Sequence, residues 1–204
     1  MIIGGGIKNT KYGHRFTQDR RNPLVARITS RFSRLHPAIR FVVLFLVSLL
    51  VLSIVFSVAS AVFNPQMLSF MALTAHLVGG VTNLFGMDVS VQDRYINAPR
   101  LAVEIIEECT GLYEIIIFIA AVLAYPATRR EKTIGVAGGI VVLYALNIVR
   151  MVFLMMVGNA RPDWFDFFHV YFWQASLILM ITSVWLLWIV KVVRNDTRRP
   201  AVHS

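Results

Sequence analysis

The chain has 204 residues, of which 57% are hydrophobic and only 15% are charged, and its mean hydropathy is +0.66. A soluble domain of this length rarely reaches such values, so the composition predicts an integral membrane protein. The net charge of +9 does not indicate nucleic-acid binding, because the basic residues flank apolar segments. The single cysteine excludes an intrachain disulfide and a cysteine-based zinc cluster.

Residues 1–40 are predicted to form a basic cytoplasmic arm. They carry nine Lys or Arg and lack a compact apolar segment with a small-residue cleavage site, so they differ from a cleaved signal peptide. The stretch NPLVARITSRFSRLHPAIRF could form an amphipathic helix on anionic lipid. The alternative is a partly disordered tail whose charge only directs membrane insertion. Residues 194–204 are expected to form a second basic cytoplasmic tail.

Four apolar segments are long enough to cross about 30 Å of hydrocarbon at about 1.5 Å per residue. They comprise residues 41–63, 105–125, 134–157 and 169–190. Most of the 20 Lys and Arg lie in the arm, in ATRREK after the second segment, and in the C-terminal tail. Because cytoplasmic loops are rich in Lys and Arg, we expect these regions and both termini to be cytoplasmic. The prediction is an all-α, multi-pass domain of the cytoplasmic (inner) membrane over residues 41–193.

Residues 66–87 form a weaker apolar segment, which is interrupted by polar residues and by Gly79 and Gly80. If ATRREK is cytoplasmic, this segment must begin and end on the outer side. We therefore predict a re-entrant or interfacial helix pair that bends at the two glycines. The alternative is a fifth helix that crosses the membrane, which would place Cys109 at the cytoplasmic face.

The sequence DVSVQDRYINAPRLAVEI, residues 88–105, alternates apolar and polar side chains. NAP, at 97–99, supplies a turn in the middle of this alternation. The pattern predicts a small extracytoplasmic β-hairpin that leads into the helix containing Cys109. An irregular outer loop is the alternative.

This topology places three residues whose side chains could take part in a reaction in the outer third of the bilayer. Cys109 lies near the outer end of the second strong segment, Arg150 lies inside the third, and His169 begins the fourth. A thiolate can attack a carbonyl, a histidine can transfer protons, and a guanidinium can stabilise the developing oxyanion. Two of them also have plainer explanations: Cys109 as an inert core residue and His169 as an interfacial anchor.

Arg150 is the most informative of the three, since a guanidinium within an apolar helix is costly and indicates function by default. Its plainer role is a structural ion pair, for which the candidate acids are Glu107, Glu108 and Glu114.

Asn147, Asp166 and Glu108 are candidates for supporting roles. Asn147 lies one turn before Arg150 on the same helix face. Asp166 could orient His169, although we favour a first-turn acid that stabilises the helix. Glu108 would raise the pKa of Cys109, or bind a basic group of a substrate. His76, His169 and the outer acids show no metal-ligand spacing, so neither a metal nor a cofactor is predicted.

ECTG around Cys109, NIVR ending at Arg150 and His169 within FFHVYFWQ follow one another at the outer ends of successive segments. With these motifs the chain resembles the exosortase/archaeosortase family of membrane-embedded cysteine transpeptidases, most of all the small exosortase H type. The resemblance covers about 41–193. It implies that Cys109 is the nucleophile, Arg150 the transition-state stabiliser and His169 the acid/base.

The resemblance also implies the partners. The substrates would be membrane-anchored secreted proteins with a C-terminal sorting signal, made of a short motif, a transmembrane helix and a basic cluster. The enzyme would cleave the signal through a thioester and transfer the protein to a cell-surface acceptor, a lipid or a glycan. Two alternatives remain: an intramembrane cysteine protease that releases its substrate by hydrolysis, and a non-enzymatic membrane assembly factor. Membrane lipids are the other expected partners.

Overall fold

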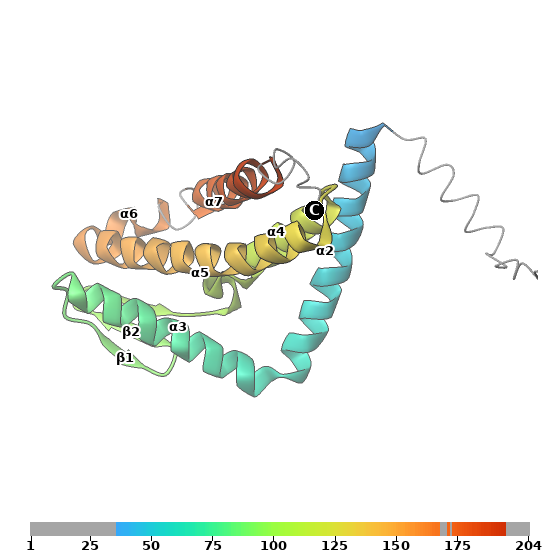
Figure 1. The fold of residues 1–204 in the computed structure, drawn as a ribbon. Helices are drawn as coiled ribbons and strands as arrows, with labels where there is room; N and C mark the ends of the chain where they lie inside the picture. Colours follow the sequence, from blue (N-terminus) through green and yellow to red (C-terminus); the bar gives the residue numbers. More distant parts are fainter. Residues whose placement is uncertain (1–35, 168–170, 172, 195–204) are drawn as a thin grey trace, which may run out of the picture. The chain divides into compact units, whose positions relative to one another are not determined.

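The computed structural model describes residues 36–167, 171 and 173–194 (Figure 1). The chain divides into two compact units, Met1–Arg40 and Phe41–Ser204, and the described residues of the first are His36 and the start of α2. The described helices and strands are, in chain order, α2 (Pro37–Val62), α3 (Asn64–Leu84), β1 (Ser90–Gln92), β2 (Tyr95–Ala98), β3 (Leu101–Glu104), the 3₁₀ turn η1 (Glu107–Thr110), α4 (Leu112–Ala124), α5 (Arg129–Ala160), α6 (Pro162–Phe167), α7 (Trp173–Trp188) and the π-helical turn η3 (Ile189–Val193).

Four of the described helices are long and apolar enough to cross a membrane. They are α2, α3, α5 and the segment Gln174–Val193 that joins α7 to η3. The predicted class, an all-α integral membrane protein, is therefore confirmed. From Phe41 onwards α2 carries no charged residue and buries none of its side chains, as expected for a helix that faces lipid.

The helix α3 is continuous through Gly79 and Gly80, so the predicted helix pair with a bend at these glycines is wrong and the segment is a single helix. Gly79 instead serves packing. A Cβ at this position would overlap the side chain of Val91 in β1, so the absence of a side chain lets the strand lie against the helix.

The predicted helical segment 105–125 begins later than expected, at Leu112. The strand β3 continues to Glu104, η1 follows it, and Gly111 adopts a left-handed conformation with φ +80° before α4 starts. Only glycine adopts such a conformation without strain, and here it separates the turn from the helix. The resulting α4 has 13 residues, which span about 20 Å, less than the thickness of the hydrocarbon core.

The predicted hairpin is present and has a third strand. The strands form an antiparallel sheet in the order β1-β2-β3, and β2 pairs with β3 from Tyr95↔Glu104 to Ala98↔Leu101. The turn between them includes Pro99, as the NAP sequence predicts. Ile96 in β2 is fully buried, which anchors the sheet to the helices.

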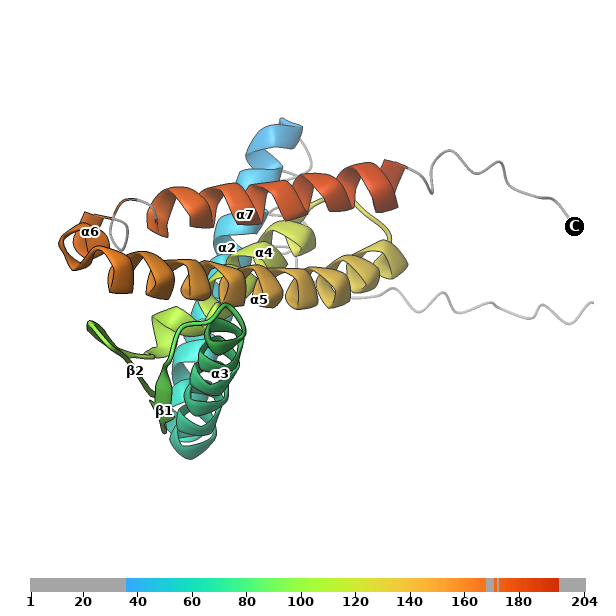
Figure 2. The same ribbon diagram turned by 90° about the vertical axis from the view of Figure 1, so that its left-hand side faces the viewer.

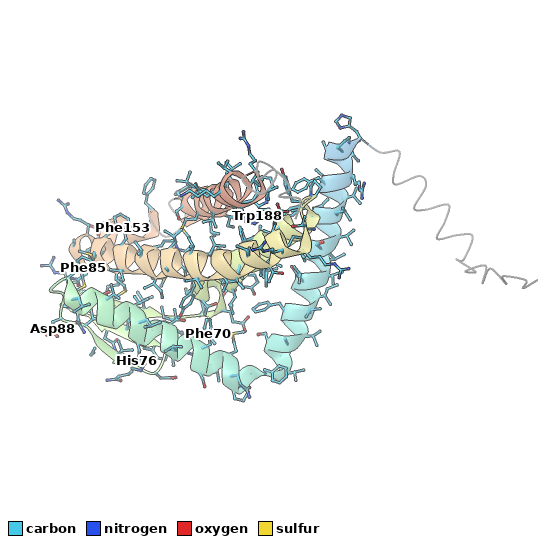
Figure 3. All side chains as sticks on the ribbon, viewed as in Figure 1. Phe70, His76, Phe85, Asp88, Phe153 and Trp188 are labelled. Carbon is cyan, nitrogen blue, oxygen red and sulfur yellow. The ribbon has the colours of Figure 1, made fainter. Side chains whose placement is uncertain are left out.

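Helix α5 is the central element, and Figures 1 and 2 show it between α7 and α3. Its start is fixed by a capping box, in which the Thr128 side chain and Glu131 bond each other's backbone N–H groups. Trp188 packs where α7 meets α4 and α5 (Figure 3), and its indole N–H donates to the carbonyl of Glu131 at 3.0 Å. Gly135 and Gly139 leave space for the rings of Trp188 and Phe118.

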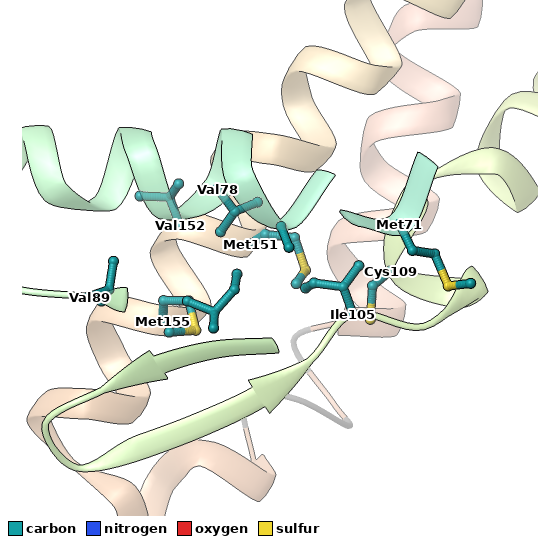
Figure 4. Close-up of a cluster of buried hydrophobic side chains, with 10 residues drawn as sticks. Met71, Val78, Val89, Ile105, Cys109, Met151, Val152 and Met155 are labelled. Carbon is teal, nitrogen blue, oxygen red and sulfur yellow. The ribbon is translucent and has the colours of Figure 1, made fainter. Parts of the chain in front are cut away.

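Two buried clusters stabilise the unit. One lies among α4, α5 and α7 and centres on Phe118, Leu143 and Trp188. The other lies among α3, the sheet, η1 and α5, and it includes Met71, Met151 and Cys109 (Figure 4). The single cysteine of the chain thus belongs to the core that joins the sheet to α5.

Candidate active site

Cys109 lies in the turn η1, between β3 and α4. Its backbone N–H donates to the carbonyl of Ile106 at 2.9 Å, and the Thr110 hydroxyl donates to the carbonyl of Glu107 at 2.6 Å. These bonds close the turn and direct the Cys109 side chain inwards, where only 4% of the residue is exposed. Figure 4 shows it beside Ile105 and Met71. The turn therefore holds the thiol at the point where the sheet, α3 and α5 meet.

Burial raises the pKa of the Cys109 thiol above its ordinary value, because the thiolate loses solvation. A backbone hydrogen bond at Ile106 and the positive charge of Arg150 act in the opposite direction. Glu108 and Glu114 add to the rise. Arg150 is therefore the side-chain charge that favours the nucleophilic form of the thiol.

Asn147 and Arg150 connect α5 to this turn. Both residues are buried, and they lie one turn apart on the same helix face. The Asn147 Nδ2 donates to the carbonyl oxygen of Cys109 at 2.8 Å, while Arg150 Nη2 donates to Asn147 Oδ1 at 2.7 Å. A Cβ on Gly111 would lie 3.1 Å from the Asn147 side chain, so the glycine allows the amide to approach the turn. The structure thus joins Cys109, Asn147 and Arg150 in one network.

Glu114 is the acid that pairs with Arg150. Arg150 Nη1 lies 3.2 Å from Glu114 Oε1, and the two side chains are only 5% and 2% exposed. Glu107 instead accepts a hydrogen bond from the Ser60 hydroxyl of α2, and the Glu108 side chain is exposed. Of the three acids named from the sequence, the structure therefore pairs Glu114 with Arg150 in a buried ion pair.

Glu114 was not among the supporting residues predicted from the sequence. The available signal was its place in LYEIIIF, where one acid interrupts an apolar run five residues after Cys109. A buried carboxylate in such a run requires a cation, and Arg150 is the arginine predicted to lie at the same depth.

The residues that match known proteins include Cys109, Glu114, Asn147 and Arg150. Residues 37–189 match the transmembrane exosortase family. The chain belongs to the transmembrane exosortase family. It is also 24% identical to the probable archaeosortase E of Methanocaldococcus jannaschii over 157 residues, which are 77% of this chain and 78% of that relative. No solved structure matches the chain. The resemblance stated from the three motifs is thereby confirmed at the level of the family.

The region matched to the exosortase family contains every residue that the sequence analysis assigned to the site. His169 lies outside the described residues, so its predicted role as acid/base stays a prediction. Asp166 is part of α6, and its side chain also lies outside the described part of the chain. Among the described residues, no group of three or more His, Cys, Asp or Glu could hold a metal ion.

Proposed function

We propose that this exosortase is a protein-sorting transpeptidase that uses Cys109 as its nucleophile. Membership of the exosortase family supports a sorting transpeptidase in general. The observation that carries the specific proposal is the hydrogen-bond chain from Cys109 through Asn147 to Arg150. It joins the turn of the single thiol of the chain to a buried cation, and in acyl transfer a thiol can serve as nucleophile and a cation can stabilise the oxyanion.

In the proposed mechanism the thiol proton of Cys109 passes to His169, and the thiolate attacks the scissile carbonyl of the sorting signal. Arg150 stabilises the oxyanion of the tetrahedral intermediate, since a guanidinium stays charged and donates hydrogen bonds in a fixed geometry. The carbon–nitrogen bond breaks, the leaving amine takes the proton from His169, and a thioester remains. An amine or hydroxyl of the cell-surface acceptor, a lipid or a glycan, then attacks the thioester, the carbon–sulfur bond breaks, and the proton of the acceptor passes through His169 to the thiolate, which regenerates the thiol.

We propose that this site faces the extracytoplasmic side of the inner membrane, with both termini cytoplasmic. The start of α5 carries Arg129 and Arg130, and Lys191 follows α7, as expected for cytoplasmic ends. The sheet lies near the opposite end of α5, where the backbone N–H of Arg100 donates to the side chain of Asn159 at 3.0 Å. In this arrangement α3 would be an interfacial helix that begins and ends on the outer side. A substrate held by its own transmembrane helix would then meet Cys109 at a high effective concentration.

The experiment that tests the proposal is trapping of the thioester. Wild type, Cys109→Ala, Arg150→Ala and His169→Ala are each co-expressed with a tagged secreted protein of the source organism that ends in a transmembrane helix and a basic cluster. Mass spectrometry then searches for a substrate fragment on Cys109. We expect an adduct in wild type or in a slow variant and none in Cys109→Ala.

The product separates this proposal from its alternatives. An added mass on the new C-terminus indicates transfer, whereas a free carboxylate indicates an intramembrane cysteine protease. Processing that is unaffected by Cys109→Ala would contradict both activities at Cys109 and favour a non-enzymatic assembly factor. Exchanging the transmembrane helix of the substrate while keeping its motif tests whether recognition occurs mainly within the membrane, and unchanged processing would contradict that view.

A further inference from the structure

The ion pair between Glu114 and Arg150 is expensive to bury. Its two side chains come from α4 and α5 and are almost fully excluded from solvent. Removing two charges from water costs free energy that their attraction often fails to recover, so apolar side chains of similar size would serve packing equally well. In addition, Glu114 Oε2 has no hydrogen-bond partner among the residues that the structure describes. Since buried polar atoms are nearly always paired, stability alone does not account for this carboxylate.

The geometry shows what the pair achieves. Glu114 Oε1 accepts from Arg150 Nη1, whereas Asn147 Oδ1 accepts from Arg150 Nη2. The guanidinium is planar, so partners on both terminal nitrogens fix the orientation of its plane. Asn147 is oriented too, because its Nδ2 must donate to the carbonyl of Cys109. The chain of contacts thus runs from α4 through α5 back to the turn that carries the thiol.

We propose that Glu114 is a positioning residue of the active site, which fixes the orientation of the Arg150 guanidinium relative to Cys109. The inference rests on the proposed function of Cys109 and Arg150. Glu114 acts through Arg150 and does not touch the substrate. In an enzyme that stabilises an oxyanion, a donor must already point at the place where the charge develops, because reorienting it during the reaction reduces the rate. The buried carboxylate supplies this orientation from the helix that follows the nucleophile.

The test uses Glu114→Gln in the full-length protein, because Gln has the same shape and lacks the charge. Two quantities are measured: kcat and KM for the tagged substrate, and the pH profile of Cys109 alkylation by iodoacetamide. We expect kcat to fall at least ten-fold with KM within two-fold of wild type. At the same time the alkylation profile should move to lower pH, because a negative charge near the thiol is lost and Arg150 is no longer neutralised. A thiol that ionises more easily but turns over more slowly is not expected from a merely structural defect.

Glu104→Gln is the matched control. It makes the same acid-to-amide change on β3, where Glu104 pairs with Arg94 at 2.8 Å on the exposed side of the sheet. This control should retain wild-type kcat. Glu114→Asp keeps the charge on a shorter side chain and should recover part of the kcat lost in Glu114→Gln. If Glu114→Gln does not fold, Glu114→Asp decides: the proposal requires at least a three-fold loss of kcat at unchanged KM.

A kcat within two-fold of wild type in Glu114→Gln would overturn the inference, and so would an unchanged kcat in Glu114→Asp if only that variant folds. Cys109→Ala, measured in parallel, separates this failure from that of the proposed function. An inactive Cys109→Ala beside a fully active Glu114→Gln removes only the role of Glu114. A fully active Cys109→Ala removes the proposed function itself.

Discussion

Asn147 donates a hydrogen bond to the carbonyl of Cys109 at 2.8 Å, although the two residues lie 38 positions apart. The bond is buried and joins the middle of α5 to the turn that precedes α4. The same amide accepts from Arg150 through its oxygen, so each end of the Asn147 side chain has a defined partner. Rotating the amide by 180° would place two donors against each other and two acceptors against each other. The orientation of this single side chain therefore determines how α5 meets the nucleophile turn.

Asn147→Asp should destabilise the protein and reduce thioester formation. The substitution replaces the Nδ2 donor with an acceptor that faces the Cys109 carbonyl, and a buried polar group without a partner costs about 1–3 kcal/mol. The free energy of unfolding is measured by denaturation in mixed micelles. Asn83→Asp is the matched control, because the Asn83 amide also donates to a backbone carbonyl, that of Val89, but on α3. Asn83→Asp should change stability and leave the pH profile of Cys109 alkylation as in wild type. A wild-type alkylation profile in Asn147→Asp as well would contradict a specific link between Asn147 and the thiol.

Gly111→Ala should be more harmful than Gly86→Ala, although both glycines have nearly the same left-handed φ, +80° and +82°. Each substitution incurs a backbone strain of about 1–3 kcal/mol. At Gly86 a Cβ meets nothing within 4 Å, whereas at Gly111 it lies 3.1 Å from Asn147. The difference in unfolding free energy between the two variants thus measures the crowding of Asn147. Equal losses of stability and activity would show that the contact with Asn147 is unimportant.

Arg150→Gln should shift the alkylation of Cys109 to higher pH. The positive charge of Arg150 favours the thiolate, so its removal raises a pKa that burial has already raised. At any given pH the thiolate fraction, and with it the alkylation rate, should fall. Arg150→Lys keeps the charge and loses the planar fork, so its profile should stay close to that of wild type while turnover drops. Intact-mass measurements after timed exposure to iodoacetamide give both profiles, and a shift to lower pH in Arg150→Gln would contradict the assignment.

The effects of Arg150→Met and Glu114→Leu on the free energy of unfolding should be strongly non-additive. Either change alone leaves one buried charge unpaired and should cost about 3–5 kcal/mol, whereas the double variant removes both charges and should recover much of the lost stability. Turnover should not recover, since the cation is absent. A double-mutant cycle of unfolding free energies, with turnover measured on the same preparations, checks this. Additive losses of stability would mean that the two side chains do not interact.

The residues that could be predicted from the sequence are those governed by local periodicity. The spacing of Asn147 and Arg150 placed them on one helix face, and the hydrogen bond between them confirms it. The alternation around the NAP turn predicted paired strands, which are present. The apolar segments predicted a helical membrane domain because hydrocarbon requires every backbone group to be satisfied within the segment.

The expectations that failed depend on contacts between distant parts of the chain. Gly79 suggested a bend, but its lack of a side chain instead leaves space for the side chain of Val91, twelve residues later. The helix expected from residue 105 starts at Leu112, because pairing with β2 keeps Glu104 in a strand. Glu114 was named only as one of three acids that could pair with Arg150, and packing of α4 against α5 selects it. These features depend on tertiary contacts, which local sequence patterns do not predict.

The bare apolar surface of α2 affects how freely its sequence can change during evolution. Among the described residues none of its side chains is buried, and its contacts with later elements include Phe56 against Tyr113 and Ser60 with Glu107. Elsewhere along α2, Leu, Ile, Val and Phe are nearly interchangeable in a lipid environment, since packing against fixed neighbours does not discriminate among them. Gly111 and Asn147, in contrast, touch each other closely enough that one methyl group matters. Related chains should therefore diverge fastest along α2 and slowest around the turn of Cys109.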